Sequence, residues 1–543
     1  MSQKIFDKII IGAGSAGCVL ARRLSEGSHL QILVVEAGPV DHRLDFRLHM
    51  PAALTYPLAG QTYNWRYRSG PEPHLDGRFI EQPRGRVLGG SSSINGMIYI
   101  RGNPLDFEKW AALPGLKSWS YAHVLPYFKR IENRLAGADL YHGDAGPLVL
   151  TTPNCENPLF DAFFEAVQQA GYPLTDDVNG YQQEGFGRFD RTTYQGRRMN
   201  AARAYLHPVL KRSNLTVRTG VEVDQILFDG KRAIGIRMGS EQIFAQEVIC
   251  CGGAINSPLL LQRSGVGDPD LLRSHGIPVV QGLQGVGENL QDHLEVYIQY
   301  ACKQPISLYP ALKWWRAPWI GAQWLFGRRG VGASNHFEAG GFIRSNDEVP
   351  YPNLQYHFLP LAIRYDGSSP EQGHGYQVHV GPMNTDVRGW VRIGGQKRTD
   401  SPEIIFNYLG TANEKKEWLE AVRITRRIMN QPAFDSFRAA EIAPGPDVQT
   451  DAEILGFLKR QVESAYHPSC TCKMGLDEAA VVGPDFTVHG VQGLRVVDAS
   501  VMPAITNGNI HAPVLMMAEK AADIILGKEL LPPEHAPFYR KGA

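Results

Sequence analysis

The sequence predicts a mixed α/β fold with more than one domain, on three observations. The chain has 543 residues, which is long enough for a large core and several domains. Residues 6–11 form a short apolar run, typical of a buried strand, that leads directly into a glycine-rich turn and a helix-like stretch. In the middle of the chain, residues 215–218 and 221–226 alternate as sheet strands do. Together these features place the chain in the α/β class.

The N-terminal unit carries a glycine motif in a specific context. The strand at 6–11 is followed by Gly12-Ala13-Gly14-Ser15-Ala16-Gly17, then by a helix and by a second apolar strand at 32–35 that ends at Glu36. This order is the G-x-G-x-x-G fingerprint of dinucleotide binding. A plain strand–turn–helix without a ligand is the alternative.

Each position of this motif has a chemical role. Gly12 permits the tight turn, Gly14 lets the backbone approach a pyrophosphate, and Gly17 allows the helix and strand to pack closely. Glu36 is placed to accept hydrogen bonds from ribose hydroxyls. The motif does not separate NAD from FAD. The expected nucleotide contacts are Gly12, Gly14, Ser15, Ala16, Gly17, Glu36 and Ala37.

Composition excludes several classes of protein. Lys+Arg and Asp+Glu both total 55, so the chain lacks the basic excess of nucleic-acid-binding proteins. The seven cysteines are scattered and odd in number, which argues against a disulfide framework and fits a reducing cytoplasm. Neither a signal-peptide pattern nor an apolar run of membrane-span length is present. We therefore expect a cytoplasmic protein with no nucleic-acid partner.

A second loop rich in glycine and serine covers residues 85–97, with the sequence GRVLGGSSSINGM. Its N–H groups and hydroxyls suit an extended phosphate-bearing ligand, and a flexible surface turn is the alternative. The loop resembles the first signature of the glucose–methanol–choline (GMC) oxidoreductases, and residues 253–267 resemble the second. Residues 286–293 and 496–503 are similar to two further segments of that family, so the resemblance extends along the chain.

The resemblance implies FAD as the cofactor and an interleaved architecture. A Rossmann-like FAD-binding domain would comprise residues 1–158, 200–300 and 464–543, and a substrate-binding domain would comprise residues 159–199 and 301–463. The second domain would be built on an antiparallel sheet, with strands such as 376–380 and 390–393, and would be flanked by helices near 415–429 and 452–462. The resemblance adds these FAD contacts: Arg86, Gly89, Gly90, Ser91, Asn95, Gly96, Met97, Val223, Asp498, Ala499 and Asn509.

The resemblance also implies the chemistry. Flavin accepts a hydride at N5, so the protein must remove the alcohol proton and orient the C–H bond. His467 would face N5 as the base or as a hydrogen-bond partner of the alkoxide, and Asn509 would hold the substrate oxygen. One alternative is a structural histidine. Another is a metal site with Cys470 and Cys472, for which no second ligand pair with zinc-like spacing exists. We expect no metal.

The residues after Asn509 predict a helix with Pro513 in its first turn. In the family this helix points its N-terminus towards the flavin pyrimidine ring, where the positive end of the helix dipole would stabilise reduced flavin. His511 would line the pocket or lie just behind it. Some family members tether FAD through a histidine just before the loop asparagine; Ile94 occupies that position here, so we expect non-covalent FAD.

Within the family the likeness is greatest to bacterial choline dehydrogenases, on residues 335–344 and 355–360. Glu338 matches a carboxylate that holds a trimethylammonium group there, and Tyr466 matches one aromatic contact. Thr55 departs from the aromatic cage of such enzymes, and Arg364 adds a positive charge. We expect oxidation of choline or another small primary alcohol to the aldehyde, with further oxidation to the acid left open.

Other functions stay open at this point. The alternatives are an oxidase that uses O₂ on an aryl or aliphatic alcohol, a hydroxynitrile lyase of the GMC fold, and a flavin-binding protein without turnover. The electron acceptor, whether a quinone, O₂ or another carrier, and the oligomeric state are not predicted.

Residues 308–330 combine four tryptophans with lysine and arginine. This composition suits a peripheral contact with the inner face of the membrane. The alternative, which helical apolar spacing favours, is a lid or surface helix that packs its tryptophans inward.

Overall fold

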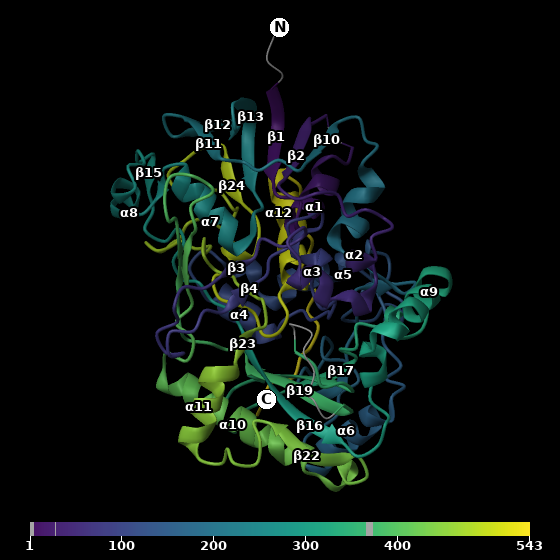
Figure 1. Ribbon diagram of the computed structural model, residues 1–543. Coiled ribbons are helices and arrows are strands. Elements are labelled where there is room, and N and C mark those ends of the chain that lie inside the picture. Colours follow the sequence, from purple (N-terminus) through teal and green to yellow (C-terminus); the bar gives the residue numbers. More distant parts are fainter. Residues whose placement is uncertain (1–4, 28, 365–372, 543) are drawn as a thin grey trace.

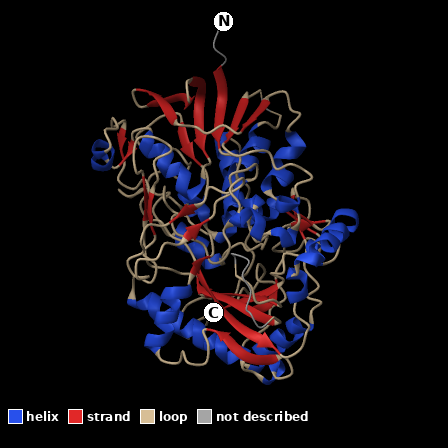
Figure 2. Ribbon diagram, in the orientation of Figure 1, coloured by secondary structure: helices blue, strands red, loops and turns tan. Residues whose placement is uncertain are grey.

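The computed structural model describes residues 5–27, 29–364 and 373–542. Two seven-stranded sheets dominate it, one at each end of the molecule in Figures 1 and 2. Helices cover both sheets, and long loops join them. The α/β class predicted from the sequence is confirmed.

The first sheet has the order β10-β2-β1-β13-β12-β11, with β24 paired to β13. Its strands are β1 (Ile5–Ile11), β2 (Ile32–Glu36), β10 (Leu215–Thr219), β11 (Gln225–Asp229), β12 (Arg232–Met238), β13 (Glu241–Cys250) and β24 (Leu494–Val496). β10, β2, β1, β13 and β24 run parallel, whereas β11, β12 and β13 pair antiparallel. Parallel strands end at one edge, so the loops after β1, β2 and β13 meet there.

The segment 221–226 departs from its prediction as one strand. Residues 221–224 are irregular, and β11 begins only at Gln225. The Gly220 and Val221 amides donate instead to the carbonyls of Gly38 and Glu36, which directs the chain past the end of β2. This detour brings Val223 to the carboxyl edge of the sheet.

The second sheet is antiparallel, with the order β22-β16-β19-β18-β17-β7 and β23 paired to β16. Its strands are β7 (Gly185–Arg188), β16 (Leu294–Cys302), β17 (Ala339–Ile343), β18 (Leu354–Leu359), β19 (Gly375–Pro382), β22 (Arg438–Ala443) and β23 (Glu463–Ser464). Both helices predicted for this region are present, as α10 (Ala412–Met429) and α11 (Asp451–Gln461).

The strand predicted at 390–393 does not belong to the second sheet. β20 (Trp390–Arg392) pairs with β21 (Glu403–Ile405) in a separate two-stranded sheet. Its backbone is held by other groups: the Val391 amide donates to the Gly287 carbonyl, and Gln262 Nε2 donates to the Val391 carbonyl. These bonds tie β20 to helix α7 and to the loop at Gly287.

The remaining elements are shorter or flank the sheets. The helices are α1 (Ser15–Leu24), α2 (Phe46–His49), α3 (Thr55–Ala59), α4 (Pro104–Ala111), α5 (Tyr121–Ile131), α6 (Pro158–Gln169), α7 (Gly253–Arg263), α8 (Pro269–Ser274), α9 (Ala317–Gly327) and α12 (His511–Ile525). The small strands are β3 (Tyr67–Arg68), β4 (Glu81–Gln82), β5 (Glu132–Arg134), β6 (Leu148–Leu150), β8 (Thr193–Tyr194), β9 (Arg197–Arg198), β14 (Val266–Gly267) and β15 (Gln281–Gly282). In the first layer α1 packs on α12, and α12 on α5.

We propose that the two sheets mark two discontinuous domains along the expected limits, with two changes. The limit expected at residue 300 falls inside β16, which pairs with β19 in the second sheet. We therefore place this boundary before Leu294. The limit expected between residues 463 and 464 divides β23, which pairs with β16, so we place it after Ser464. β7 and β17 are paired, so we assign the short stretch 159–199, which contains β7, to the second domain.

α9 and the turns before it protrude from the side of the molecule (Figure 1). Trp324 is buried and donates its indole N–H to the Gly196 carbonyl, but Trp314, Trp315 and Trp319 are 80%, 59% and 67% exposed. The inward packing expected of these tryptophans therefore holds for Trp324 alone. Trp319 precedes it by five residues, about 140° around a helix, and so lies on another face. No helix in the described part of the chain has the length and apolarity to cross a membrane.

Candidate active site

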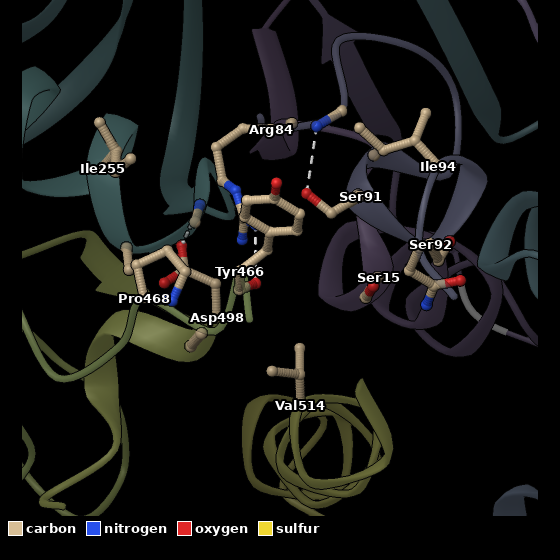
Figure 3. A pocket seen from close by; sticks show the side chains of 18 of the residues that line it. Ser15, Arg84, Ser91, Ser92, Ile94, Ile255, Tyr466, Pro468, Asp498 and Val514 are labelled. Carbon is tan, nitrogen blue, oxygen red and sulfur yellow. Dashed lines mark hydrogen bonds between the residues drawn. The ribbon is translucent and has the colours of Figure 1, made fainter. Parts of the chain in front are cut away.

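A cavity of about 270 Å³ lies between the two sheets, lined by loops of the first sheet and by residues of β16 and β18 in the second. Glu36 and Val223 line one end, and His467 and Asn509 line the other. Figure 3 shows Arg84 and Tyr466 side by side in its wall, with Val514 pointing towards them from α12. The cavity thus connects the dinucleotide fingerprint with the two polar residues expected to carry the chemistry.

Packing requires two glycines of the fingerprint, whereas the third leaves free space. A Cβ on Gly12 would lie 2.5 Å from the Cys251 carbonyl oxygen, and a Cβ on Gly17 would lie 1.9 Å from that of Gly12. A Cβ on Gly14 would meet nothing closer than the Gly90 Cα at 3.9 Å. The fold therefore does not require a glycine at position 14. A ligand that runs along the backbone does require one, because a Cβ there would obstruct it. This cradle fits a dinucleotide.

Glu36 closes the far end of the cavity. Its carboxylate accepts hydrogen bonds from the Ala13 amide at 2.9 Å and the Gly38 amide at 2.8 Å. Burial raises the pKa of Glu36 to about 7, against the lowering effect of these amides. The side chain is thereby fixed beside the nucleotide end of the cavity.

His511 provides a second sign of a ligand. It is the first residue of α12, its Nδ1 lies 3.1 Å from Ser15 Oγ, and its Nε2 is buried without a hydrogen-bond partner. Burial, reinforced by Arg198, lowers the pKa of His511 to about 4. A neutral imidazole nitrogen at the positive end of a helix fits the polar edge of a flavin ring.

The reaction end of the cavity is a chain of hydrogen bonds between side chains. His467 Nε2 lies 3.1 Å from Asn509 Nδ2, and His467 Nδ1 lies 3.1 Å from His293 Nδ1. Gln355 Nε2 donates to Asn509 Oδ1 at 3.1 Å. Burial lowers the pKa of His467 well below its usual range, and His293, Arg84 and His357 reinforce this shift. His467 is therefore a neutral imidazole that can accept a proton.

The loop that carries His467 is held in an uncommon conformation. Tyr466 has φ of 67°, a left-handed value that is rare for a tyrosine. Asp292 Oδ1 accepts from the His467 amide at 2.7 Å, and Arg84 donates to the Tyr466 carbonyl at 2.7 Å. Backbone strain of this kind persists where surrounding bonds determine the geometry, which is typical of active sites.

Next to His467 the cavity is lined by aromatic rings and one carboxylate. Phe337 and Tyr466 supply the rings, and Glu295 supplies the carboxylate. Trp65 also lines the cavity, where its ring stacks on Tyr67 at 5.9 Å. Glu295 Oε1 lies 3.1 Å from His379 Nδ1, which holds it in place. Aromatic faces together with a buried carboxylate are suited to a quaternary ammonium group.

Glu338 does not line the cavity. Its carboxylate pairs with Arg191 at 3.2 Å and accepts a hydrogen bond from Ser334 Oγ. The expected cation-binding carboxylate is thus already paired with an arginine. The sequence analysis missed Glu295, although it lies two residues after the motif at 286–293 and is the second residue of the buried strand β16.

Most of the other expected site residues line the cavity. These are Gly12, Gly14, Ser15, Ala16, Glu36, Ala37, Gly90, Ser91, Asn95, Gly96, Met97, Val223, Asp498, Ala499, Asn509, Tyr466, His467 and His511. Gly17, Arg86 and Gly89 do not. Gly17 packs against the turn, the Arg86 guanidinium lies 5.1 Å from the centre of the Trp65 ring, and the Gly89 amide donates to the Ala13 carbonyl at 2.7 Å.

The metal alternative finds no support at His467. Among the described residues, the group with metal-ligand spacing is Asp139, His142 and Asp177, which is a different part of the molecule. Cys470 and Cys472 are buried free thiols, and burial raises the pKa of both. Thiolate ligands are therefore disfavoured there.

Comparison with known proteins places these features in context. Residues 6–295 match the N-terminal part of the GMC oxidoreductase family, and residues 385–518 match its C-terminal part. The chain is 56% identical over 546 residues to an oxygen-dependent choline dehydrogenase of Staphylococcus xylosus, covering 99% of this chain and 98% of the relative. It is 56% identical over 551 residues to one of Pseudomonas fluorescens, covering 100% of this chain and 97% of the relative.

Solved structures agree with the fold. Pyridoxine 4-oxidase from Mesorbium loti superposes with a TM-score of 0.87 at 32% identity, covering 96% of this chain and all of that one. A formate oxidase superposes with a TM-score of 0.90 at 24% identity, covering 97% of this chain and 99% of the other, a likeness of fold.

Proposed function

The chain belongs to the GMC oxidoreductase family, and from that premise we propose that it oxidises the primary alcohol of choline to the aldehyde, with FAD as cofactor. Alcohol oxidation with FAD is the chemistry of the family. One observation carries the assignment of the site: His467 and Asn509 face the same cavity whose other end holds the dinucleotide fingerprint. The residue roles and the substrate are the proposed parts.

The chemistry divides between the cofactor and the protein. FAD, held by the two glycine loops, Glu36 and His511, supplies the acceptor for the hydride from the alcohol C–H bond. His467 Nε2 takes the hydroxyl proton, because the ring is neutral and faces the cavity. The Asn509 amide beside it donates a hydrogen bond to the substrate oxygen as negative charge develops there.

We propose that FAD is bound without a covalent link. Ile94 lines the cavity at the position where some family members carry the tethering histidine, and it has no nucleophilic atom. Acid precipitation of the purified protein tests this: the yellow colour should pass into the supernatant. Colour that stays in the washed pellet would identify a covalent attachment.

The choice of choline rests on the relatives and on the part of the cavity next to His467, which we call the chamber. Both quoted relatives are named oxygen-dependent choline dehydrogenases, and their similarity covers the whole chain. In the chamber, Glu295 takes the role that the family resemblance gives to Glu338, since Glu338 is paired with Arg191. The rings of Phe337 and Tyr466 complete a site for the trimethylammonium group.

Anaerobic reduction of the bound flavin tests the function directly. Choline should bleach the yellow holoprotein, and neutral primary alcohols of similar size should do so far more slowly. A protein that stays yellow with every alcohol would be a lyase or a flavin-binding protein without turnover. Admitting O₂ to the reduced protein then tests the acceptor, which we propose to be O₂ because the relatives' names state oxygen dependence.

We also propose that α9 and the preceding turns contact an anionic membrane surface. Trp314, Trp315, Trp319 and Phe326 are exposed there, and Lys313, Arg316, Arg328 and Arg329 accompany them. Exposed aromatic rings with basic neighbours suit the interface of anionic lipid. Sedimentation with phosphatidylglycerol vesicles should carry the protein down, and changing all three exposed tryptophans to alanine should abolish this. Equal sedimentation of both proteins would exclude the contact.

A further inference from the structure

His293 is a buried histidine with no expected role, and it contacts the base on the side away from the cavity. Its ring lies 5.2 Å from that of His467, nearly perpendicular to it at 81°. It immediately precedes β16, whereas His467 follows β23. Two histidines from distant segments are thus joined by one nitrogen–nitrogen contact of 3.1 Å.

The directions of these hydrogen bonds can be worked out from their ends. His293 Nε2 lies 3.0 Å from the Met383 carbonyl oxygen, which can only accept, so Nε2 carries a proton. Burial lowers the pKa of His293 to about 3, so the ring is neutral and its Nδ1 has only a lone pair. That nitrogen can accept a hydrogen bond but cannot donate one.

The same logic then fixes the proton on His467. Because His293 Nδ1 accepts, His467 Nδ1 must donate to it. A neutral imidazole carries one ring proton, so His467 Nε2 is left bare. The Asn509 amide donates to that nitrogen, and Asn509 Oδ1 accepts from Gln355. In the series of hydrogen bonds that runs from Gln355 through Asn509, His467 and His293 to the Met383 carbonyl, every donor meets an acceptor only with this set of directions.

We propose that His293 is a positioning residue that holds His467 as the Nδ1–H tautomer. Its unprotonated Nε2, which accepts from the Asn509 amide in this structure, can then take the alcohol proton when that amide donates to the substrate oxygen instead. This inference rests on the proposed function, in which Nε2 is the base. In the other tautomer the proton would sit on Nε2 opposite the Asn509 amide, donor against donor, and the lone pair would point away from the alcohol. His293 thus has a role comparable to that of the group that orients the histidine of a catalytic triad.

The other groups around His467 do not supply this control. Asp292 accepts from the His467 backbone amide and not from the ring. Arg84 is bonded to the Tyr466 carbonyl. His357 lines the cavity and contributes, like Arg84, by disfavouring the protonated ring. Among the described residues, His293 is the hydrogen-bonding partner of His467 Nδ1.

Two substitutions separate the proposed role from simple packing. Asn at position 293 can place its amide oxygen near the position of Nδ1 and keep an acceptor for His467. Gln reaches further and can keep the bond to the Met383 carbonyl without offering that acceptor. The test measures the ¹⁵N shifts of the His467 ring in histidine-labelled holoenzyme, assigned by comparison with His467→Gln, together with the rate of flavin reduction by choline.

We expect wild-type His467 to be protonated on Nδ1, and His293→Asn to keep that signature with a rate near wild type. His293→Gln should move the proton to Nε2 and slow reduction roughly 10- to 100-fold, the usual cost of losing a group that orients a site residue, with choline affinity unchanged. Equal loss in both variants, or a wild-type ring protonated on Nε2, overturns the proposal.

The wild-type spectrum decides the tautomer even where a variant does not fold. Failure of the proposed function gives a different pattern. If His467 is not the base, His467→Ala will reduce its flavin at the wild-type rate, although the ¹⁵N shifts still report the Nδ1–H tautomer.

Discussion

The two ends of the cavity are built in different ways. The nucleotide end consists largely of backbone: a tight turn, a helix N-terminus and two glycine loops, with Glu36 fixed by two amides. The reaction end consists of side chains, since His293, Gln355, His467 and Asn509 come from four segments far apart in the sequence. One end recognises a ligand by close approach, and the other depends on the direction of individual hydrogen bonds.

The largest effects are expected at the nucleotide end, where two substitutions can distinguish a glycine that folding requires from a glycine that FAD binding requires. Gly17→Ala should prevent folding, because its Cβ would lie 1.9 Å from the Gly12 carbonyl oxygen. Gly14→Ala should fold but lose FAD. Its Cβ would clash with no protein atom, but it would occupy space that the bound cofactor needs. Circular dichroism reports folding, and the ratio of flavin to protein absorbance reports FAD content.

Gly321→Ala is the matched control for both variants. Gly321 lies within α9, and a Cβ there would meet nothing within 4 Å. It should behave as wild type in both measurements. A Gly14→Ala protein that keeps its full FAD content would contradict the backbone cradle, and a folded, yellow Gly17→Ala protein would contradict the packing argument.

This contrast also explains what could be predicted from the sequence. The strand–turn–helix around Gly12 is local, so motif and apolar pattern located β1, α1, β2 and Glu36 closely. The helix after Asn509 was equally local, with Pro513 in its first turn. The signatures fixed the family and therefore FAD. Short-range rules are sufficient wherever the backbone itself makes the site.

Features that depend on tertiary pairing escaped prediction. The alternation at 221–226 is compatible with a strand, but the Val221 amide bonds to the chain after β2. Likewise, motif matching pointed to Glu338. The pairing of its carboxylate with Arg191 could not be predicted, because only the fold brings the two side chains together. His293 was present in a quoted motif, yet nothing in the sequence indicates that its Nδ1 meets His467. Partners of buried polar side chains are set by the fold.

At the reaction end, His467→Ala should keep FAD and fold while slowing flavin reduction roughly 10²- to 10⁴-fold, the usual range for a general base. The loss falls on the limiting rate, because the ring contributes to proton transfer. Anaerobic stopped-flow absorbance measures it, with FAD content as the control. Reduction within a few-fold of wild type would remove His467 from proton transfer.

Substitution of Glu295 in the chamber beside His467 should have a smaller effect, which is selective for the binding of choline. Glu295→Gln should weaken choline binding by roughly 2–5 kcal/mol, the cost of breaking a desolvated charge pair, and spare neutral alcohols. Glu338→Gln is the matched control, since its carboxylate faces Arg191. The dissociation constants come from the concentration dependence of flavin reduction. Selective loss of choline binding in Glu338→Gln, with Glu295→Gln unaffected, would return the role to Glu338.

The smallest expected effect is in the pH dependence of the rate, which should differ from that of stability. Burial lowers the pKa of His293 to about 3 and those of His357 and His511 to about 4, and holds that of His467 well below its usual range. The base therefore stays unprotonated, and flavin reduction should not fall as pH is lowered through about 6.5, the ordinary value for histidine.

Stability should respond in that same interval. As pH falls from about 6.5 towards 4, the unfolded chain binds protons on these four rings and the folded chain does not. The contribution of these four rings to the free energy of unfolding therefore decreases with falling pH. Glu36 contributes in the opposite direction, because burial raises its pKa to about 7 and the folded chain binds its proton first. Urea unfolding and stopped-flow reduction at the same pH values measure both. A rate that declines with an apparent pKa near 6.5 would mean that His467 is exposed to solvent protons, and the contrast between a shielded reaction end and an open nucleotide cradle would no longer hold.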